Sequence, residues 1–337
     1  MKRLVSSGVC ALVVLGLAAC SSDVAEDTDA APTKDATPAG PWEWDDADGE
    51  TVTLDEVPTR IIAHSGAAAA LMSYGIRPIG IYADESVKTD PNLQGLDLDG
   101  IEILGEEWGS IDVAKASTLN PDLIVADWWP AEKAHSGLEE GVKEKSKDLA
   151  KLADVVGAPQ GGSIMALTEG YEKLAESLGA DIESSQGAKD RAAFEAARDE
   201  FSALMEEKEI SALAVSPASD LLYVANPEFA PELLDFAEWG LGVIEPDAVD
   251  KDFPYWENLS WENADKYQPD VVLIDGRTFD DSVKTAEDQP TWTSIRAAQE
   301  GQVIEWPAFW LHTYRDYAEA LEKLTDDLSD VDVTVGD

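Results

Sequence analysis

Asn120-Pro121-Asp122-Leu123-Ile124-Val125-Ala126-Asp127 in the first half of the chain is matched by Gln268-Pro269-Asp270-Val271-Val272-Leu273-Ile274-Asp275 in the second half. Each copy follows a short helical pattern. In both copies Pro ends that helix, Asp is suited to bond the local backbone at the turn, and four apolar residues predict a buried strand. The repeat therefore predicts two similar α/β halves with a cleft between them.

Short apolar runs rich in Val and Ile recur along the chain, and each is followed by a helical stretch. The expected strands are 60–63, 76–82, 122–126, 210–215, 271–274 and 303–305. Strands that alternate with helices predict central parallel sheets in an α/β fold. Two further helices, 67–74 and 231–239, are followed by Gly75 and Gly240, which can supply left-handed caps.

Residues 184–207 show a long helical pattern with apolar side chains on one face and charged side chains on the other. An earlier helix is expected at 164–178, ended by Gly179. Because the long helix lies between the halves, we expect it to join two Rossmann-like lobes as one stiff backbone helix. The N-terminal lobe is then 42–183 and the C-terminal lobe 208–337.

The N-terminus is typical of a bacterial lipoprotein export signal. Lys2 and Arg3 precede a short apolar run that closes at Leu17-Ala18-Ala19-Cys20. Such a run is too short to span a membrane comfortably, and small residues before Cys20 suit a signal peptidase. We expect removal of 1–19 and a lipid on Cys20, which anchors the protein to the extracytoplasmic face of the cell membrane. Residues 20–41 have the composition of a disordered tether. A plain secretory signal or an anchor helix are the alternatives.

The charge and the cysteine content exclude several function classes. The chain has 24 Lys and Arg against 69 Asp and Glu, a net charge of −45, which argues against nucleic acid and against adsorption to anionic lipid. Such acidity serves solubility and favours neutral or cationic ligands. Cys10 and Cys20 are the two cysteines, so the mature domain would have no thiol for a disulfide, a Cys-type zinc site or a catalytic nucleophile.

The order and spacing of several motifs resemble the substrate-binding lipoproteins of bacterial ABC importers, in the iron-siderophore and cobalamin class, over residues 42–328. These motifs are 49–54, 57–63, 74–81, 119–125 and 267–274. The resemblance implies a monomer that captures a ferric siderophore or a similar chelate and delivers it to a permease and its ATPase. It implies no cofactor and no chemistry.

The same resemblance implies docking residues. In this class an acid near the start of the helix before each Pro-Asp strand contacts permease arginines, and Glu262 stands at that place before Pro269. The matching place before Pro121 is Ala114, a departure from the pattern, and Asp112 two residues earlier is the candidate substitute. An acid in the first turn of a helix is also favoured by the helix dipole alone.

Ligands of open α/β sheets bind beyond the carboxyl ends of the strands, and aromatic residues follow these ends here. Flat rings pack against an apolar chelate and attract cations through their faces, while Arg can bond hydroxamate or carboxylate oxygens. The predicted ligand-binding residues are His64, Ser65, Tyr82, Trp108, Trp128, Trp129, Tyr223, Trp256, Arg277, Trp306 and Trp310. Core packing is the alternative for each aromatic, and a salt bridge is expected for at least one of Arg277 and Arg315.

The alternatives concern the cargo and the class of protein. A neutral or cationic hydroxamate chelate fits the acidity better than a triply anionic catecholate, and haem or a corrinoid stays open. A bare metal ion is disfavoured because the histidines are His64, His135 and His312, of which His135 is expected to be exposed. An enzyme is disfavoured because no nucleophile elbow, zinc helix, phosphate loop or dinucleotide fingerprint is present. A surface adhesion protein is the remaining alternative.

Overall fold

The computed structural model describes residues 40–130, 132–160, 162–183, 185–249, 251, 254–308 and 311–336. The expected signal, most of the tether and Cys20 lie outside the described residues. The described residues belong to one compact unit. Among them, no helix has both the length and the apolar character that a membrane span requires.

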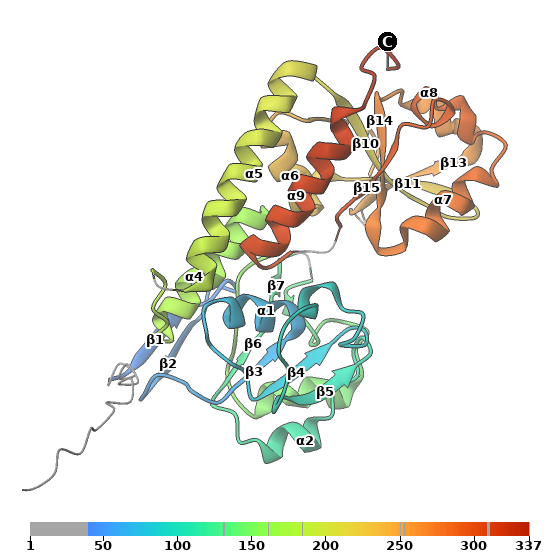
Figure 1. Cartoon of the computed structure of the whole chain (residues 1–337). Helices are drawn as coiled ribbons and strands as arrows, with labels where there is room; N and C mark the ends of the chain where they lie inside the picture. The colour runs from blue at the N-terminus through green and yellow to red at the C-terminus, as the bar shows by residue number, and fades with distance from the viewer. Residues whose placement is uncertain are drawn as a thin grey trace, which may run out of the picture. The chain divides into compact units, whose positions relative to one another are not determined.

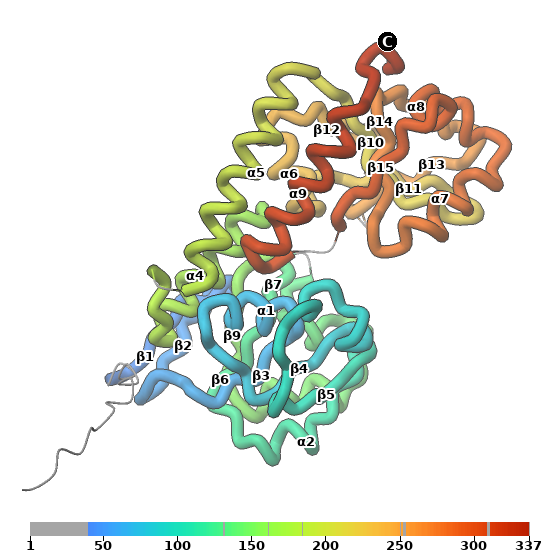
Figure 2. Tube along the Cα trace, in the orientation of Figure 1, coloured from blue at the N-terminus to red at the C-terminus, as the bar shows by residue number. Residues whose placement is uncertain are grey.

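The first lobe contains, in its described part, a five-stranded parallel sheet in the order β5-β4-β3-β6-β9 (Figures 1 and 2). The strands are β3 (Ile61–His64), β4 (Gly80–Ala83), β5 (Glu102–Glu106), β6 (Leu123–Val125) and β9 (Val155–Val156). Two hairpins accompany the sheet, β1 (Trp42–Asp45) with β2 (Thr51–Leu54) and β7 (Trp128–Trp129) with β8 (Ala134–His135). The helices are α1 (Ser65–Ser73), η1 (Pro91–Leu93), α2 (Val113–Thr118), α3 (Glu144–Lys147), η2 (Asp148–Lys151) and α4 (Ile164–Ser177).

The second lobe contains, in its described part, a six-stranded sheet in the order β13-β11-β10-β14-β15, with β12 beside the start of β10. The strands are β10 (Ser211–Pro217), β11 (Leu221–Ala225), β12 (Gly242–Val243), β13 (Trp256–Ser260), β14 (Val271–Asp275) and β15 (Val303–Trp306). The helices are η3 (Pro227–Phe229), α6 (Pro231–Glu238), η4 (Trp261–Lys266), η5 (Gly276–Thr278), α7 (Phe279–Glu287), η6 (Trp292–Ser294), α8 (Arg296–Gln299) and α9 (Tyr314–Ser329).

The α/β class with central parallel strands is confirmed, but the second sheet is not parallel throughout. β10, β14 and β15 run parallel, whereas β11 and β13 are antiparallel additions at one edge. The cause is the short connection between β10 and β11, in which the Ala218 N–H donates to the Leu221 carbonyl at 2.9 Å. A turn this short can only reverse the chain, because a parallel neighbour requires a long crossover.

The repeated Pro-Asp sequence has the same structural role in both lobes. Asp122 accepts from the backbone N–H of Arg60 at 2.8 Å, and Asp270 accepts from the N–H of Ser211 at 2.8 Å. Each carboxylate therefore bonds the beginning of the parallel neighbour, β3 or β10, rather than its own turn as we expected. Because β3 pairs with β6 and β10 pairs with β14, the repeat fixes the register at the centre of each sheet.

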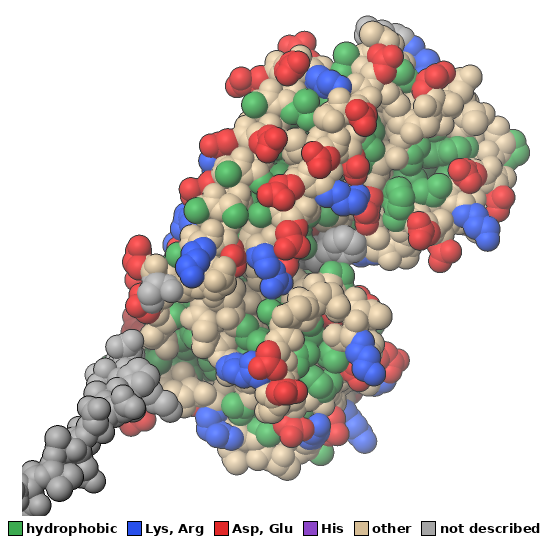
Figure 3. Space-filling view, in the orientation of Figure 1, with side chains coloured by type: hydrophobic (Ala, Val, Ile, Leu, Met, Phe, Trp, Pro, Cys, Tyr) green, Lys and Arg blue, Asp and Glu red, His purple; other side chains and the backbone are tan. Residues whose placement is uncertain are grey.

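The backbone helix is α5 (Gln186–Lys208), which packs along α9 (Figures 1 and 2). Ser185 caps its start by accepting from the Ala188 N–H at 3.1 Å. The buried Phe194 of α5 stacks on Tyr317 of α9 with ring centroids 5.0 Å apart, whereas the buried Phe201 packs against Phe236. The sequence pattern identified α5 but not its partner α9. Figure 3 shows Asp and Glu side chains spread over both helices and both lobes.

Candidate functional site

A cavity of about 440 Å³ lies between segments that leave the strand ends of the two lobes. We refer to it as the aromatic cavity. From the first lobe it is lined by Trp108, Trp129, Glu132, Glu139 and Glu140. From the second lobe it is lined by Ala225, Phe229, Ala230, Tyr255, Trp256, Arg277, Trp306 and Ala308. Because both lobes contribute, this cavity corresponds to the cleft expected from the repeat.

Ring contacts and hydrogen bonds hold most of the aromatic walls in place. Trp256 packs edge-on against Trp306, with centroids 6.4 Å apart, and Phe229 packs edge-on against Tyr255 at 5.2 Å. The Trp129 Nε1–H donates to the Ser136 hydroxyl at 2.8 Å. Walls that are fixed in this way can receive a bulky, partly apolar ligand at a small entropic cost.

Two polar groups in the walls have no hydrogen-bond partner among the described residues. The Nε1 atom of Trp306 is one of them, on a side chain that is 3% exposed. The other is the buried Oε2 atom of Glu139. Burial raises the pKa of Glu139, backbone amides oppose the rise, and Asp84 reinforces it. The cavity therefore has a donor and an acceptor for which the described protein supplies no partner.

The charged residues among the described lining side chains are Glu132, Glu139, Glu140 and Arg277. Arg277 is paired with Asp275 at the end of β14: its Nε lies 2.9 and 3.1 Å from the two carboxylate oxygens, and its Nη2 also contacts Asp275. Across the cavity, the Tyr255 hydroxyl of the second lobe donates to Glu132 of the first lobe at 3.3 Å, and burial together with Glu132 raises the pKa of Tyr255 to about 12. The walls consequently carry an excess of negative charge.

The cavity brings together five of the predicted ligand-binding residues, namely Trp108, Trp129, Trp256, Arg277 and Trp306. It also includes Glu132, Glu139, Glu140, Phe229 and Tyr255, which sequence reasoning missed. The one available signal was position: the three glutamates follow Trp129 within a dozen residues, and Tyr255 directly precedes Trp256. Trp310 lies outside the described residues.

The other predicted ligand-binding residues do not line the aromatic cavity. His64, Ser65 and Tyr82 are buried in the first lobe, where the Tyr82 hydroxyl donates to the Ser136 carbonyl at 2.8 Å. Trp128 packs edge-on against His135, and Tyr223 packs behind Trp256. The sequence placed His64 and Tyr82 just after the apolar runs of their strands, but β3 and β4 include them.

The histidines are held inside the protein. His312 lies 2.8 Å from Asp127 through Nε2 and 3.0 Å from Asn92 through Nδ1, which anchors the segment before α9 to the first lobe. His135, expected to be exposed, is buried and lies 3.0 Å from Asp46. The expectation failed because the charged residues around His135 face solvent while the β7–β8 hairpin turns its ring inward.

His64 is buried beside the Asp84 carboxylate. Burial alone would lower its pKa, but Asp84 at 3.3 Å, with Asp127 and Asp90 further away, raises the pKa of His64 to about 9. Among the residues that the structure describes, no group of three or more His, Cys, Asp or Glu side chains is arranged to hold a metal ion.

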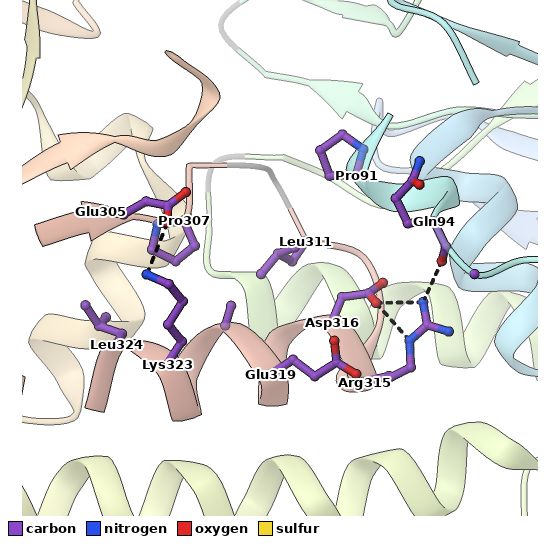
Figure 4. A pocket seen from close by; sticks show the side chains of 12 residues that line it. Pro91, Gln94, Glu305, Pro307, Leu311, Arg315, Asp316, Glu319, Lys323 and Leu324 are labelled. Carbon is purple, nitrogen blue, oxygen red and sulfur yellow. Dashed lines mark hydrogen bonds and ion pairs between the residues drawn. The ribbon is translucent and has the colours of Figure 1, made fainter. Parts of the chain in front are cut away.

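A second cavity of about 550 Å³, the α9 groove, lies beside α9 and η1 (Figure 4). Glu319 lines the groove, and both cations of the described lining are paired with other carboxylates: Lys323 lies 3.1 Å from Glu305, and Arg315 Nε lies 2.9 Å from Asp316. Its described lining contains no aromatic side chain. Because these charges are already paired and no flat rings are present, we take the aromatic cavity as the candidate ligand site.

Comparison with known proteins agrees with this architecture. The chain is similar to DesE, a ferric-siderophore receptor protein from Streptomyces coelicolor, with 31% identity and a TM-score of 0.72 over 87% of this chain and 99% of DesE. A model of the periplasmic binding protein family matches residues 142–308. The chain belongs to the periplasmic binding protein family. The resemblance noted in the sequence is thereby confirmed.

Two further similar proteins extend the comparison. The Fe(3+)-citrate-binding protein YfmC of Bacillus subtilis is 25% identical over 77% of this chain and 76% of YfmC. The iron uptake substrate-binding protein PiuA from Streptococcus pneumoniae shares the fold, with 18% identity and a TM-score of 0.60 over 87% of this chain and 99% of PiuA. These relatives are described as receptor and binding proteins, which confirms the prediction of a solute-binding protein and not an enzyme.

Proposed function

We propose that this protein captures a ferric siderophore of the hydroxamate type in the aromatic cavity and delivers it to an ABC permease and its ATPase. The main support for the proposal is the composition of the cavity, which has aromatic walls, three glutamates and one arginine. The positive charge of this arginine is already paired with Asp275. The relatives that bind ferric siderophore or ferric citrate support an iron chelate as the cargo.

The charge of the walls separates the chelate classes. A ferric tris-catecholate carries three negative charges, whereas a ferric tris-hydroxamate is neutral at the metal and becomes cationic when it has a pendant amine. Like charges about 8 Å apart repel by about 2 kcal/mol at an effective dielectric constant of about 20. Three glutamates therefore penalise a trianion by several kcal/mol and favour a cation. The aromatic faces add cation–π attraction for the same ligand.

Ferric citrate is the second candidate, because YfmC is described as a Fe(3+)-citrate-binding protein. In this case Arg277 would have to bond citrate oxygens in competition with Asp275, which already contacts its Nε and Nη2 atoms. The hydroxamate proposal avoids that competition, and we prefer it for this reason.

The location is part of the same proposal. We infer that a lipid on Cys20 anchors the protein at the extracytoplasmic face of the cell membrane, on the strength of the Leu-Ala-Ala-Cys sequence and the family. Glu262 in the first turn of η4 and Asp112 before α2 are the proposed permease contacts. Both side chains are exposed, and the Asp112 carboxylate accepts from the Lys115 N–H at 2.9 Å as a helix cap. Glu262 is the better candidate because it stands at the position that the resemblance assigns to the docking acid.

The decisive experiment is a ligand titration followed by tryptophan fluorescence. Residues 37–337, which belong to one compact unit, are titrated with a ferric tris-hydroxamate, a ferric tris-catecholate, ferric citrate, haem and cobalamin. We expect saturable quenching with the hydroxamate and not with its iron-free form, because Trp108, Trp129, Trp256 and Trp306 line the cavity. If ferric citrate binds more tightly than the hydroxamate, ferric citrate becomes the proposed ligand. If none of these ligands binds, the proposal is refuted.

A further inference from the structure

The aromatic cavity contains an arginine that the fold keeps occupied. Asp275 is the last residue of β14, and its side chain is 4% exposed, whereas the Arg277 side chain is 47% exposed at the cavity wall. The carboxylate accepts from the backbone N–H of Arg277 at 3.0 Å as well as from Nε and Nη2. One buried carboxylate thus fixes both the backbone turn and the guanidinium of Arg277.

This pairing removes the usual function of an arginine in a binding site. A free guanidinium offers a flat fork of N–H groups that matches two oxygens of a carboxylate, and catecholate oxygens can approach it in the same way. Here the Nε–Nη2 side of the fork is directed at Asp275. Asp275 raises the pKa of Arg277, and Glu232, a 1% exposed residue of α6, raises this pKa further. The positive charge of Arg277 at the cavity wall is therefore compensated by buried carboxylates of the protein.

The repeat gives an independent view of this arrangement. Asp127 ends the first copy of the Pro-Asp sequence and Asp275 ends the second. Asp127 is 2% exposed and receives His312 from the chain segment before α9, so its charge is spent on holding the fold together. Asp275 is equally buried, but its cationic partner lines a ligand cavity. The aspartate that ends the repeat therefore bonds a fold-stabilising histidine in the first lobe and a cavity-lining arginine in the second lobe.

We propose that Asp275 determines the charge selectivity of the site, because it withholds Arg277 from anionic chelates. The inference rests on the proposed function and deepens it: the cargo is a neutral or cationic ferric chelate because Asp275 neutralises the arginine of the cavity. Asp275→Asn frees the guanidinium, while the Asn side-chain carbonyl still accepts from the Arg277 N–H and preserves the turn. This substitution separates a role in selectivity from a role in capping.

The test compares a cationic ferric tris-hydroxamate with anionic ferric citrate by fluorescence titration of wild type, Asp275→Asn and Asp275→Asn/Arg277→Gln. We expect Asp275→Asn to bind ferric citrate at least tenfold more tightly than wild type and to lose this gain in high salt. The double variant restores the overall charge of the wild-type pair, so its ratio of affinities should return to that of wild type.

A matched control is available in the α9 groove. Arg315 pairs with Asp316, whose side chain is 14% exposed, and Asp316→Asn frees an arginine at a place that does not line the aromatic cavity. It should leave both affinities unchanged. An equal gain in Asp316→Asn would show that net charge alone is responsible and would overturn the inference, as would an unchanged ratio in Asp275→Asn.

The remaining outcomes of these titrations also test the inference. If Asp275→Asn does not fold, as judged by thermal unfolding, Asp275→Asn/Arg277→Gln replaces it, because this variant removes both charges and keeps the net charge of the pair: loss of ferric citrate affinity in that variant would show that wild-type Arg277 already engages anions and would overturn the inference. Retained citrate affinity would support it. If wild type binds the hydroxamate and neither variant changes the affinity for ferric citrate, the inference is refuted while the proposed function stands. No binding of either chelate by any protein would refute the proposed function as well.

Discussion

At the scale of single residues, Glu139 is the carboxylate of the cavity that is most affected by burial. Its Oε2 atom is buried without a hydrogen-bond partner among the described residues, and its pKa is raised. The charged groups that influence it are Asp84, which favours protonation, and His64, which opposes it. A cationic ligand would supply the missing partner.

We predict that Glu139→Gln weakens binding of a cationic hydroxamate chelate by about tenfold, since one charge-assisted contact is lost. Wild-type affinity should be greatest where Glu139 is ionised and should fall as the pH decreases through its raised pKa. Dissociation constants measured between about pH 4 and about pH 8, a range that brackets the pKa values of raised carboxyl groups, test this pH dependence. The slope should be absent from Glu139→Gln. Glu107→Gln, which removes an exposed carboxylate outside the cavity lining, should behave as wild type.

Sequence reasoning identified the aromatic residues of the site better than its acids. Trp108, Trp129 and Trp306 were found because parallel strands end at a common edge and large rings are conspicuous there. Glu132 and Glu139 were missed because a chain with 69 Asp and Glu gives no local signal that separates a solvated carboxylate from one in a cavity wall. Burial of a charge depends on tertiary packing, which the local sequence does not encode.

At the scale of elements, α1 meets the segment before α9 at a glycine. A Cβ on Gly66 would lie 2.3 Å from Cε1 of the His312 ring. His312 cannot move aside freely, because Asp127 and Asn92 hold both ring nitrogens. The close approach of helix and ring therefore depends on the absence of a side chain at this position.

Gly66→Ala should destabilise the protein by about 1–3 kcal/mol, because overpacking outweighs the gain in helix propensity of about 1 kcal/mol. Urea denaturation measures the change. Adding His312→Ala should remove much of the penalty, so that the two substitutions are not additive. Gly162→Ala, whose Cβ would meet only Ala166 at 3.8 Å, is the control. Additive effects of Gly66→Ala and His312→Ala would contradict the proposed clash.

The start of α4 is capped by a residue of another helix. Asp235 in α6 accepts from the Ile164 N–H at 2.9 Å and from the Tyr317 hydroxyl at 2.8 Å. Burial outweighs these hydrogen bonds and raises the pKa of Asp235 to about 6. The native state therefore holds a proton on this carboxyl at a pH where the unfolded chain has lost it.

The sign of the pH dependence follows from this difference. The contribution of Asp235 to stability is fully present below the unfolded pKa of about 3.9 and is lost as the pH rises through 6, by about 3 kcal/mol in total. Asp235→Asn should remove this dependence and be more stable than wild type at neutral pH. Denaturation curves at about pH 4 and about pH 7, which bracket most of the loss, test this assignment. A variant that keeps the wild-type slope would contradict it.

The elements themselves were only partly predictable. All six expected strands are present among the described residues, although β4 begins at Gly80 instead of residue 76 because Pro78 lacks an N–H for the ladder. Gly75 and Gly240 end their helices with positive φ, as predicted. The antiparallel edge and the pairing of α5 with α9 were missed, because they depend on turn length and on long-range packing rather than on periodicity.

At the scale of the whole molecule, delivery requires a surface for the permease. We predict that Glu262→Ala lowers uptake of the chelate in cells while ligand affinity stays at the wild-type value, because Glu262 is exposed and does not line the aromatic cavity. Uptake of labelled iron and titration of the purified variant give the two readouts. Glu300→Ala, which removes another exposed acid of the second lobe, should transport normally. Unchanged uptake by Glu262→Ala would exclude Glu262 from the docking surface.

The two cavities share one stretch of backbone at the end of β15. Glu305, Pro307 and Leu311 line the α9 groove, whereas Trp306 and Ala308 line the aromatic cavity. Alternate residues of an extended chain point to opposite sides, so mutations that reshape the ligand wall leave the Glu305–Lys323 pair with α9 in place. If the aromatic cavity holds the ligand as proposed, a change at Ala308 would therefore alter the cargo while the contact of Glu305 with α9 stays in place.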